Sequence, residues 1–133
     1  MTSELLVLTL VLMLAATLWM PFIIRVGTTD ARTSVENGLA TVDAMPRAAR
    51  MADRAHQNLL EQTLPFAGLI LVNHALGVSS AATVAAAWTF LALRLTHAAI
   101  MLLDIRQMPV RPIVFTAAWL CTLALGIGAL RLG

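Results

Sequence analysis

The stretch that decides the fold is RAHQNLLEQTLPF, residues 54–66. It carries Arg54, Asn58 and Glu61, and it runs into an apolar segment with no further charge until Arg94. Residues at positions i, i+4 and i+7 share one face of an α-helix. A polar face on an apolar membrane helix points into a bundle or a wet cavity rather than at lipid. The stretch therefore predicts a membrane helix whose polar face meets other protein groups or water.

The composition of the whole chain indicates an integral membrane protein. Its 133 residues are 59% hydrophobic and only 12% charged, with a mean hydropathy of +0.84. A soluble domain carries about 25% charged residues. The formal net charge of +2 is small, so no nucleic-acid-binding surface is expected. The single cysteine, Cys121, lies in an apolar run and excludes an intrachain disulfide.

Four segments are long enough to cross a bilayer core of about 30 Å, which needs roughly 20 apolar residues. We expect helices at about 4–25, 50–76, 81–104 and 110–131, and so an all-α, integral membrane four-helix bundle in a single domain. The segment 26–49 is expected to form a long cytoplasmic loop. The residues before the first apolar run, MTSE, carry no positive charge. We therefore expect a retained helix there rather than a signal peptide.

The placement of arginines predicts the orientation in the membrane. The first and third connections carry most of them: Arg25, Arg32, Arg47, Arg50, Arg106 and Arg111. The N-terminus and the second connection have none, and the C-terminus has only Arg131. The positive-inside rule then places connections 1 and 3 in the cytoplasm and both termini outside. The Ala/Arg-rich composition without lysine favours a bacterial cytoplasmic membrane.

The charged residues of the second and third helices are predicted to meet. At 1.5 Å per residue, Glu61 and Arg94 both lie about 8–10 Å inside the cytoplasmic boundary of a ~30 Å core. Because the short second connection makes the two helices antiparallel neighbours, we expect a Glu61–Arg94 ion pair. Insertion costs about 2.5–3.5 kcal/mol for each such residue at a helix centre, and pairing offsets part of that cost. The alternative is a structural pair that fixes helix register and binds nothing.

A wider set of donors points to an anion site. Arg54, Asn58, His97 and Arg111 converge on the cytoplasmic half of the membrane without enough acids to neutralise them. Arg111 lies in the first turn of the expected last helix, where backbone N–H groups and the helix dipole also favour an anion. The sequence therefore predicts a cationic, donor-rich pocket for a small anionic ligand. It shows no constellation of metal ligands.

Two blocks of sequence resemble a known family. The order R-A-H-x-N-x-x-E-x-x-x-P-F in residues 54–66 resembles the second-helix signature of the MAPEG family, the membrane-associated proteins in eicosanoid and glutathione metabolism. The block RLTHAAIMLLDIRQMPVRPIVF, residues 94–115, is similar to the end of that family's third helix and the start of its fourth, with a one-residue insertion near residues 107–108. The resemblance implies a homotrimer that binds glutathione between neighbouring protomers on the cytoplasmic side.

The resemblance also implies roles for individual residues. It assigns glutathione binding to Arg54, Asn58, Glu61, Arg94 and His97, and catalysis to Arg111. The arginine at the position of Arg111 lies near the glutathione sulfur in that family. A guanidinium there would stabilise the thiolate, which is the nucleophilic form of the thiol.

The sequence departs from the family pattern at several positions. It contains no tyrosine, and Met101 and Phe115 occupy positions where the family places tyrosines. Pro112 stands where some members have a serine, and Gln57 stands where some have another basic residue. Several hydrogen bonds to a glutathione-like peptide would therefore be missing, which leaves catalysis open.

Three functions follow from these residues. The first is a glutathione-dependent membrane transferase or peroxidase, with glutathione as co-substrate and a lipophilic electrophile reaching it from the bilayer. The second is a non-catalytic membrane protein of the same fold that binds a lipid or a small anion, or serves as an assembly partner; the missing tyrosines favour it. The third is a proton-coupled exporter with Glu61 as relay, disfavoured because such transporters usually keep their acid in the first helix and because Glu61 has Arg94 available.

Overall fold

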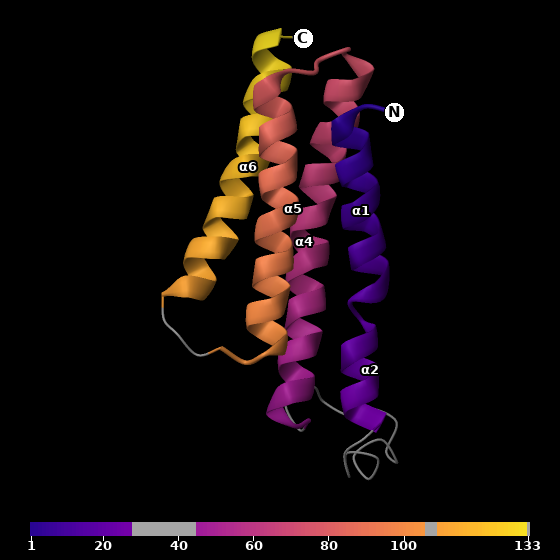
Figure 1. Cartoon of the computed structure of the whole chain (residues 1–133), viewed down its shortest axis with the longest axis vertical. Coiled ribbons are helices and arrows are strands. Elements are labelled where there is room, and N and C mark those ends of the chain that lie inside the picture. The colour runs from indigo at the N-terminus through magenta and orange to yellow at the C-terminus, as the bar shows by residue number, and fades with distance from the viewer. Residues whose placement is uncertain (28–44, 106–108, 133) are drawn as a thin grey trace.

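The computed structural model describes residues 1–27, 45–105 and 109–132, and every regular element in them is an α-helix. The helices are α1 (Ser3–Thr17), α2 (Met20–Gly27), α4 (Arg47–Ala75), α5 (Ala81–Leu102) and α6 (Val110–Leu132). They run along one long axis, with α2 continuing the direction of α1 (Figure 1). The prediction of an all-α four-helix bundle is confirmed. Most of the expected loop 26–49 and the expected insertion near residues 107–108 lie outside the described residues.

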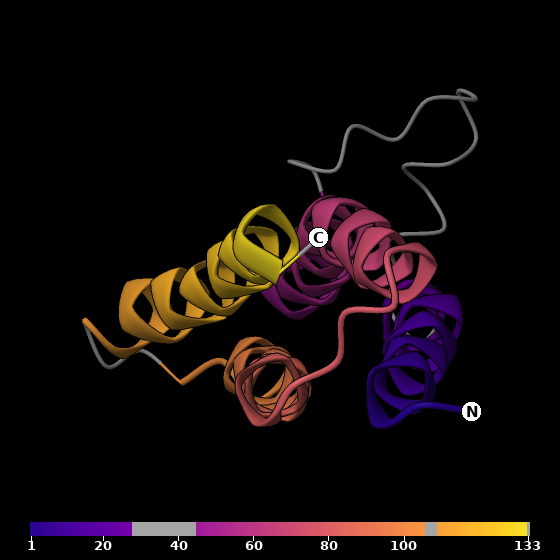
Figure 2. The same ribbon diagram turned by 90° about the horizontal axis from the view of Figure 1, so that it is seen from above.

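The two ends of the bundle differ, and we name them for what they carry. The turn end holds the α4–α5 connection, residues 76–80, together with both termini (Figure 1). The arginine end holds α2, the start of α4, the end of α5 and the start of α6. The described arginines of that end are Arg25, Arg47, Arg50, Arg54 and Arg111. Seen from above, α6 is tilted so that it stands away from α5 at the arginine end (Figure 2).

The first apolar segment is an interrupted helix. The expected single helix 4–25 is broken at Leu18 and Trp19, where Leu18 caps α1 and α2 begins at Met20. Pro21 lies in the first turn of α2, where its missing N–H and fixed φ are tolerated, whereas a continuous helix would lose a hydrogen bond there. The segment Ser3–Gly27 is still long and apolar enough to cross a membrane.

Three segments of the described chain have the length and hydropathy of membrane spans: Ser3–Gly27, Ala81–Leu102 and Val110–Arg131. The remaining long helix of the bundle, α4, is longer than these segments but more polar. Its buried face recurs at helical spacing and includes Leu59, Gln62, Phe66, Ile70 and Asn73. That face packs on the other helices, as expected for a helix whose polar groups are kept from lipid.

The apolar core consists of two clusters with a polar layer between them. The cluster toward the turn end centres on Phe66 and Phe90, whose rings stack with centroids 3.9 Å apart. The cluster toward the arginine end contains Leu59, Ala98 and five further residues: Ala15, Leu18, Met51, Ala55 and Met101. Gln62 follows Leu59 and precedes Phe66 on α4, so its level lies between the clusters. The apolar core is therefore divided at the level of that side chain.

Candidate functional site

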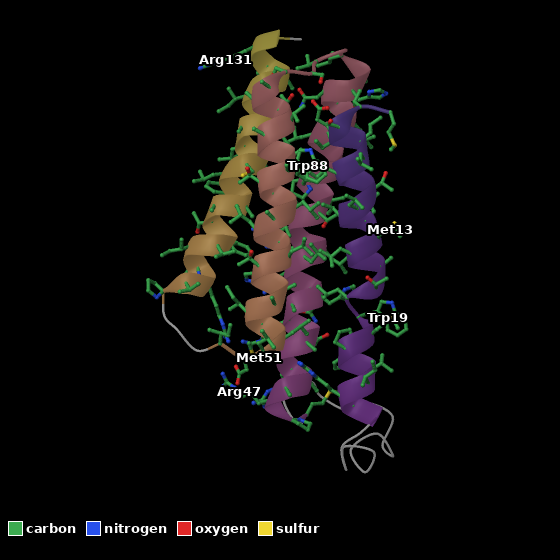
Figure 3. All side chains as sticks on the ribbon, viewed as in Figure 1. Met13, Trp19, Arg47, Met51, Trp88 and Arg131 are labelled. Atoms are coloured by element: carbon green, nitrogen blue, oxygen red, sulfur yellow. The ribbon has the colours of Figure 1, made fainter. Side chains whose placement is uncertain are left out.

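A pocket of about 360 Å³ opens at the arginine end, where α6 stands away from α5. Three helices line it with Met51, Arg54, Asn58, His97, Met101, Arg111, Pro112 and Phe115. Four of the six residues that the sequence predicted for the site are therefore brought to one pocket. Figure 3 shows Met51 at this end of α4, next to Arg47.

The α4 wall of the pocket supplies free donors. Arg54 and Asn58 lie one turn apart, Arg54 exposed and Asn58 half-buried. Neither side chain has a hydrogen bond or ion pair with any residue that the structure describes. A guanidinium offers five N–H donors, and a side-chain amide offers two donors and one acceptor oxygen. This wall can therefore receive a carboxylate or another anion without first breaking a contact.

The α6 wall is built around Arg111, which pairs with Asp104 of the α5–α6 connection. The Arg111 Nη2 atom lies 3.3 Å from Asp104 Oδ1. Arg47 donates to the same carboxylate more closely, with Nε 2.8 Å from Oδ2 and Nη2 2.9 Å from Oδ1. Because one carboxylate faces two guanidinium groups, these three side chains carry a net positive charge. The Nε atom of Arg111 is buried and has no partner within the described residues.

The backbone of Asp104 is unusual. Its φ of 50° is in the left-handed region that non-glycine residues rarely adopt. It follows the C-cap of α5, Leu103, where such a conformation closes the helix end. That turn places the carboxylate between Arg47 of α4 and Arg111 of α6. The sequence analysis did not assign a site role to Asp104 or Arg47.

The predicted Glu61–Arg94 ion pair is wrong. Arg94 is only 1% exposed, and its Nη1 atom donates to Gln62 Oε1 at 3.2 Å. Glu61 is exposed and has no hydrogen bond or ion pair among the described residues. Consecutive residues of an α-helix point about 100° apart. The prediction placed Glu61 and Arg94 at one depth but ignored this rotation, which turns Gln62 inward and Glu61 outward. Glu61 therefore pairs with no arginine that the structure describes, and that reason for discounting it as a proton relay falls away.

Arg94 and His97 form a buried polar wall behind the pocket. The Arg94 guanidinium lies 5.9 Å from the centre of the Phe115 ring, and its Nε atom has no partner in the described chain. His97 is 4% exposed and lines the pocket, and its Nδ1 atom is likewise unpartnered. A buried charge without an acidic partner is costly. The Arg94 guanidinium thus favours a negative group on the pocket side, and the unpartnered Nδ1 atom of His97 offers a further polar contact.

The sequence analysis missed several residues of the site, and only some of them carry a signal in the sequence. Gln62 could have been found, because it falls on the same helical stripe as Leu59 and Phe66. Asp104 could not have been found from local pattern, since its partner Arg47 is 57 residues away in the sequence. Met51 and Met101 line the pocket as well, and nothing in their apolar context marks them.

These features define an all-helical integral membrane protein with a cationic, donor-rich pocket at one end of its bundle. The sequence model of the MAPEG family matches residues 6–131, nearly the whole chain, and the chain belongs to this family. The resemblance seen in residues 54–66 and 94–115 is therefore confirmed. No match was found among curated proteins or among solved structures.

Proposed function

We propose that this protein is a glutathione-dependent membrane transferase or peroxidase that conjugates or reduces lipophilic electrophiles. The single observation that carries the proposal is the pocket at the arginine end, in which Arg54, Asn58, His97 and Arg111 meet. A cationic pocket suits glutathione, since this peptide carries two carboxylates and a thiol that ionises. The family to which the chain belongs is named for glutathione metabolism.

Arg111 is the proposed catalytic residue. The thiolate attacks the electrophilic atom, a sulfur–carbon bond forms, and the leaving group departs with its electron pair. A guanidinium close to the sulfur favours the thiolate over the thiol and so raises the fraction of nucleophile. Pro112 has no backbone N–H, which removes one donor from the start of α6. The side chain of Arg111 is the charged donor that the start of this helix offers to an anion.

A homotrimer is part of the proposal, and Glu61 supports it. Glu61 shares a helical face with Arg54 and Asn58 but is exposed on the single protomer. A charged side chain at this depth is costly against lipid. Contact with a neighbouring protomer would remove that cost. Glu61 would then face the amine of a glutathione bound between the two protomers.

The lipophilic substrate has a place next to the proposed thiolate. A second pocket of about 400 Å³ lies on α6 and is lined by Pro112, Ile113, Thr116, Ala117 and Leu120. It shares Pro112 with the cationic pocket. An electrophile dissolved in the bilayer can occupy this apolar surface while glutathione enters from the cytosol. The proposed orientation, with the arginine end in the cytoplasm, agrees with the positive-inside rule.

Purified protein tests this function directly. Glutathione is titrated into the detergent-solubilised chain while the ultraviolet absorbance of the thiolate is recorded, and an aryl halide then tests turnover. Saturable thiolate formation followed by conjugation supports the proposal. Failure to bind glutathione contradicts it.

The alternative is a non-catalytic MAPEG-fold protein that binds a lipid or a small anion, or acts as an assembly partner. Met101, Pro112 and Phe115 favour it, because with Met51 they make four of the eight pocket-lining side chains unable to form a strong hydrogen bond. In the titration above, binding of glutathione without thiolate formation or turnover selects this alternative. Displacement of glutathione by an anionic lipid would then identify the ligand class.

A further inference from the structure

A separate cavity lies at the turn end. That end is opposite the arginine end of the bundle (Figure 1). Its volume is about 210 Å³, and it is formed by the residues that begin α1, the last turns of α4 and the α4–α5 connection. Glu4, Asn73, Thr2, Ser79 and His74 supply its polar lining. The glutathione chemistry proposed for the arginine end involves none of these residues.

Glu4 brings a buried carboxylate to this cavity. The residue is 5% exposed, and its Oε1 atom accepts hydrogen bonds from Ser79 Oγ at 2.8 Å and Thr83 Oγ1 at 2.9 Å. Its Oε2 atom is buried and has no partner. Glu4 forms no ion pair with any residue that the structure describes. The carboxylate is thus held by neutral hydroxyls, with half of its acceptor capacity unused.

Asn73 brings a second unused acceptor. It is 2% exposed, and its Nδ2 atom donates to Leu69 O at 2.8 Å and Leu125 O at 3.0 Å. Two carbonyl acceptors fix the orientation of the amide, because the opposite orientation would place oxygen against oxygen. The Oδ1 atom therefore has a defined position, and it is buried without a partner among the described residues.

Two unpartnered acceptors, one of them charged, indicate what the cavity lacks. Ordered water could satisfy the oxygens but would place no positive charge beside the buried carboxylate. No group of three or more histidine, cysteine, aspartate or glutamate side chains in the described chain could hold a metal ion. A protonated amine supplies a positive charge and three N–H donors in one small group. A cavity several times the volume of a water molecule has room for it.

We propose that the Glu4 cavity binds a protonated primary amine, with Glu4 as its counter-ion and Asn73 as a second acceptor. The amine is either a free small molecule or the ethanolamine headgroup of a membrane lipid. Both sources present the same –NH₃⁺ group. A headgroup reaches the cavity readily because Glu4 lies at the end of the apolar segment Ser3–Gly27.

Thermal unfolding of the purified full-length protein in an amine-free buffer tests the proposal. Methylammonium is titrated against tetramethylammonium, sodium and potassium at equal ionic strength. We expect methylammonium to raise Tm by several degrees in a saturable manner, because a ligand that binds the folded state stabilises it. Tetramethylammonium has no N–H donor and should leave Tm unchanged. An equal effect of all four cations, or no effect of methylammonium, overturns the proposal.

Variants locate the effect. Glu4→Gln should weaken methylammonium binding about tenfold or more, since a charge-assisted hydrogen bond is lost. The matched control is Asp53→Asn, which neutralises a carboxylate that contacts Gln57 at the arginine end. It should retain the wild-type response. Equal responses of the two variants contradict the assignment to Glu4.

A second variant covers the case in which Glu4→Gln does not fold. His74 is exposed and lines the cavity, so His74→Trp should fill the cavity without disturbing the core. We expect it to abolish the methylammonium response. A folded His74→Trp protein that binds methylammonium as wild type does would place the amine elsewhere and overturn the proposal.

Native mass spectrometry distinguishes the two sources of the amine. The protein is extracted from bilayers that contain phosphatidylethanolamine or only phosphatidylcholine. Retention of phosphatidylethanolamine by the wild type and Asp53→Asn, but not by Glu4→Gln, identifies the headgroup. Binding of methylammonium without lipid retention identifies a soluble amine. Both results support the site, whereas retention of either lipid by Glu4→Gln at wild-type level counts against it.

Discussion

The two ends of the bundle close their helices in the same way but with different residues. At the turn end, α4 ends with Gly77 at a φ of 71°, and the Val78 N–H donates to the Asn73 carbonyl. At the arginine end, α5 ends with Asp104 at a φ of 50°, and the Ile105 N–H donates to the Ile100 carbonyl. Both are Schellman motifs.

The difference lies in what the left-handed residue contributes. Glycine adopts this conformation without a steric cost and adds no side chain. Aspartate pays a penalty in the backbone, but its carboxylate bridges Arg47 and Arg111. The left-handed residue of one turn therefore only closes the helix, while that of the other also organises the charges of the pocket.

A buried carboxylate at one end and a half-buried one at the other extend this contrast. Glu4 at the turn end is held by the hydroxyls of Ser79 and Thr83 and forms no ion pair with a described residue. Asp104 at the arginine end is overcompensated by two guanidinium groups. The molecule thus presents a negative site at one end and a positive site at the other, and the two should prefer ligands of opposite charge.

The largest expected effect is at Arg111. Under the proposed function, Arg111→Leu should lower conjugation of an aryl halide by about 100-fold, because a donor to the developing thiolate is lost. Its thiolate absorbance at saturating glutathione should fall in parallel. The control is Arg131→Leu, which removes an exposed arginine from the turn end and should retain both signals. Parallel losses in the two variants would show a general effect of charge rather than a site.

The next effect concerns the polar layer. Gln62→Leu leaves the Arg94 guanidinium without its hydrogen-bond acceptor, which should cost about 1–3 kcal/mol of unfolding free energy. Gln57→Leu, on the same helix, removes only an exposed contact with Asp53 and should change stability by less than about 0.5 kcal/mol. Denaturant unfolding of both variants measures the difference. Equal stabilities would show that Arg94 finds another partner.

Substitutions at the two left-handed residues test the comparison of the two turns. Gly77→Ala should destabilise the fold by about 1–2 kcal/mol through backbone strain alone, since a Cβ there meets no atom within 4 Å. Asp104→Gly should be nearly neutral in stability, because relief of strain offsets the loss of partly exposed ion pairs. Its thiolate absorbance should nevertheless decrease, as Arg111 loses its anchor. Unfolding and absorbance measured on the same samples separate the two roles, and unchanged absorbance would limit Asp104 to capping.

The smallest expected effect is at Ser79. Ser79→Ala removes one of the two hydroxyl donors to Glu4, and we expect a loss of about 0.5–1.5 kcal/mol. Ser3→Ala removes the hydroxyl of an exposed serine next to Glu4 in the sequence, so it serves as the control. Thermal unfolding of the pair measures the contribution. A loss well above this range would mean that Glu4 depends on Ser79 alone.

Sequence reasoning succeeded for features that depend on the hydropathy or the helical repeat of a single segment. Hydropathy identified the helical segments, and the helical repeat brought Arg54 and Asn58 to the same pocket wall. It failed where both the depth of a residue and the direction of its side chain mattered. Depth alone paired Arg94 with Glu61, but the side chain that points toward Arg94 is that of Gln62. The break at Leu18 was missed because a count of apolar residues says nothing about backbone hydrogen bonds, although Pro21 signalled it. The Asp104 bridge depends on chain segments that only folding brings together.

The polar layer at Gln62 and Arg94 has a consequence for how the two ends communicate. A close-packed apolar core transmits displacements from one side chain to the next. Here that chain of contacts is interrupted, and the stacked rings of Phe66 and Phe90 lie on the turn-end side of the interruption. Occupation of the pocket should accordingly change amide hydrogen exchange in the half that contains it, while protection around the stacked rings stays constant. The two halves of the bundle would then respond separately to a ligand, although the same helices run through both.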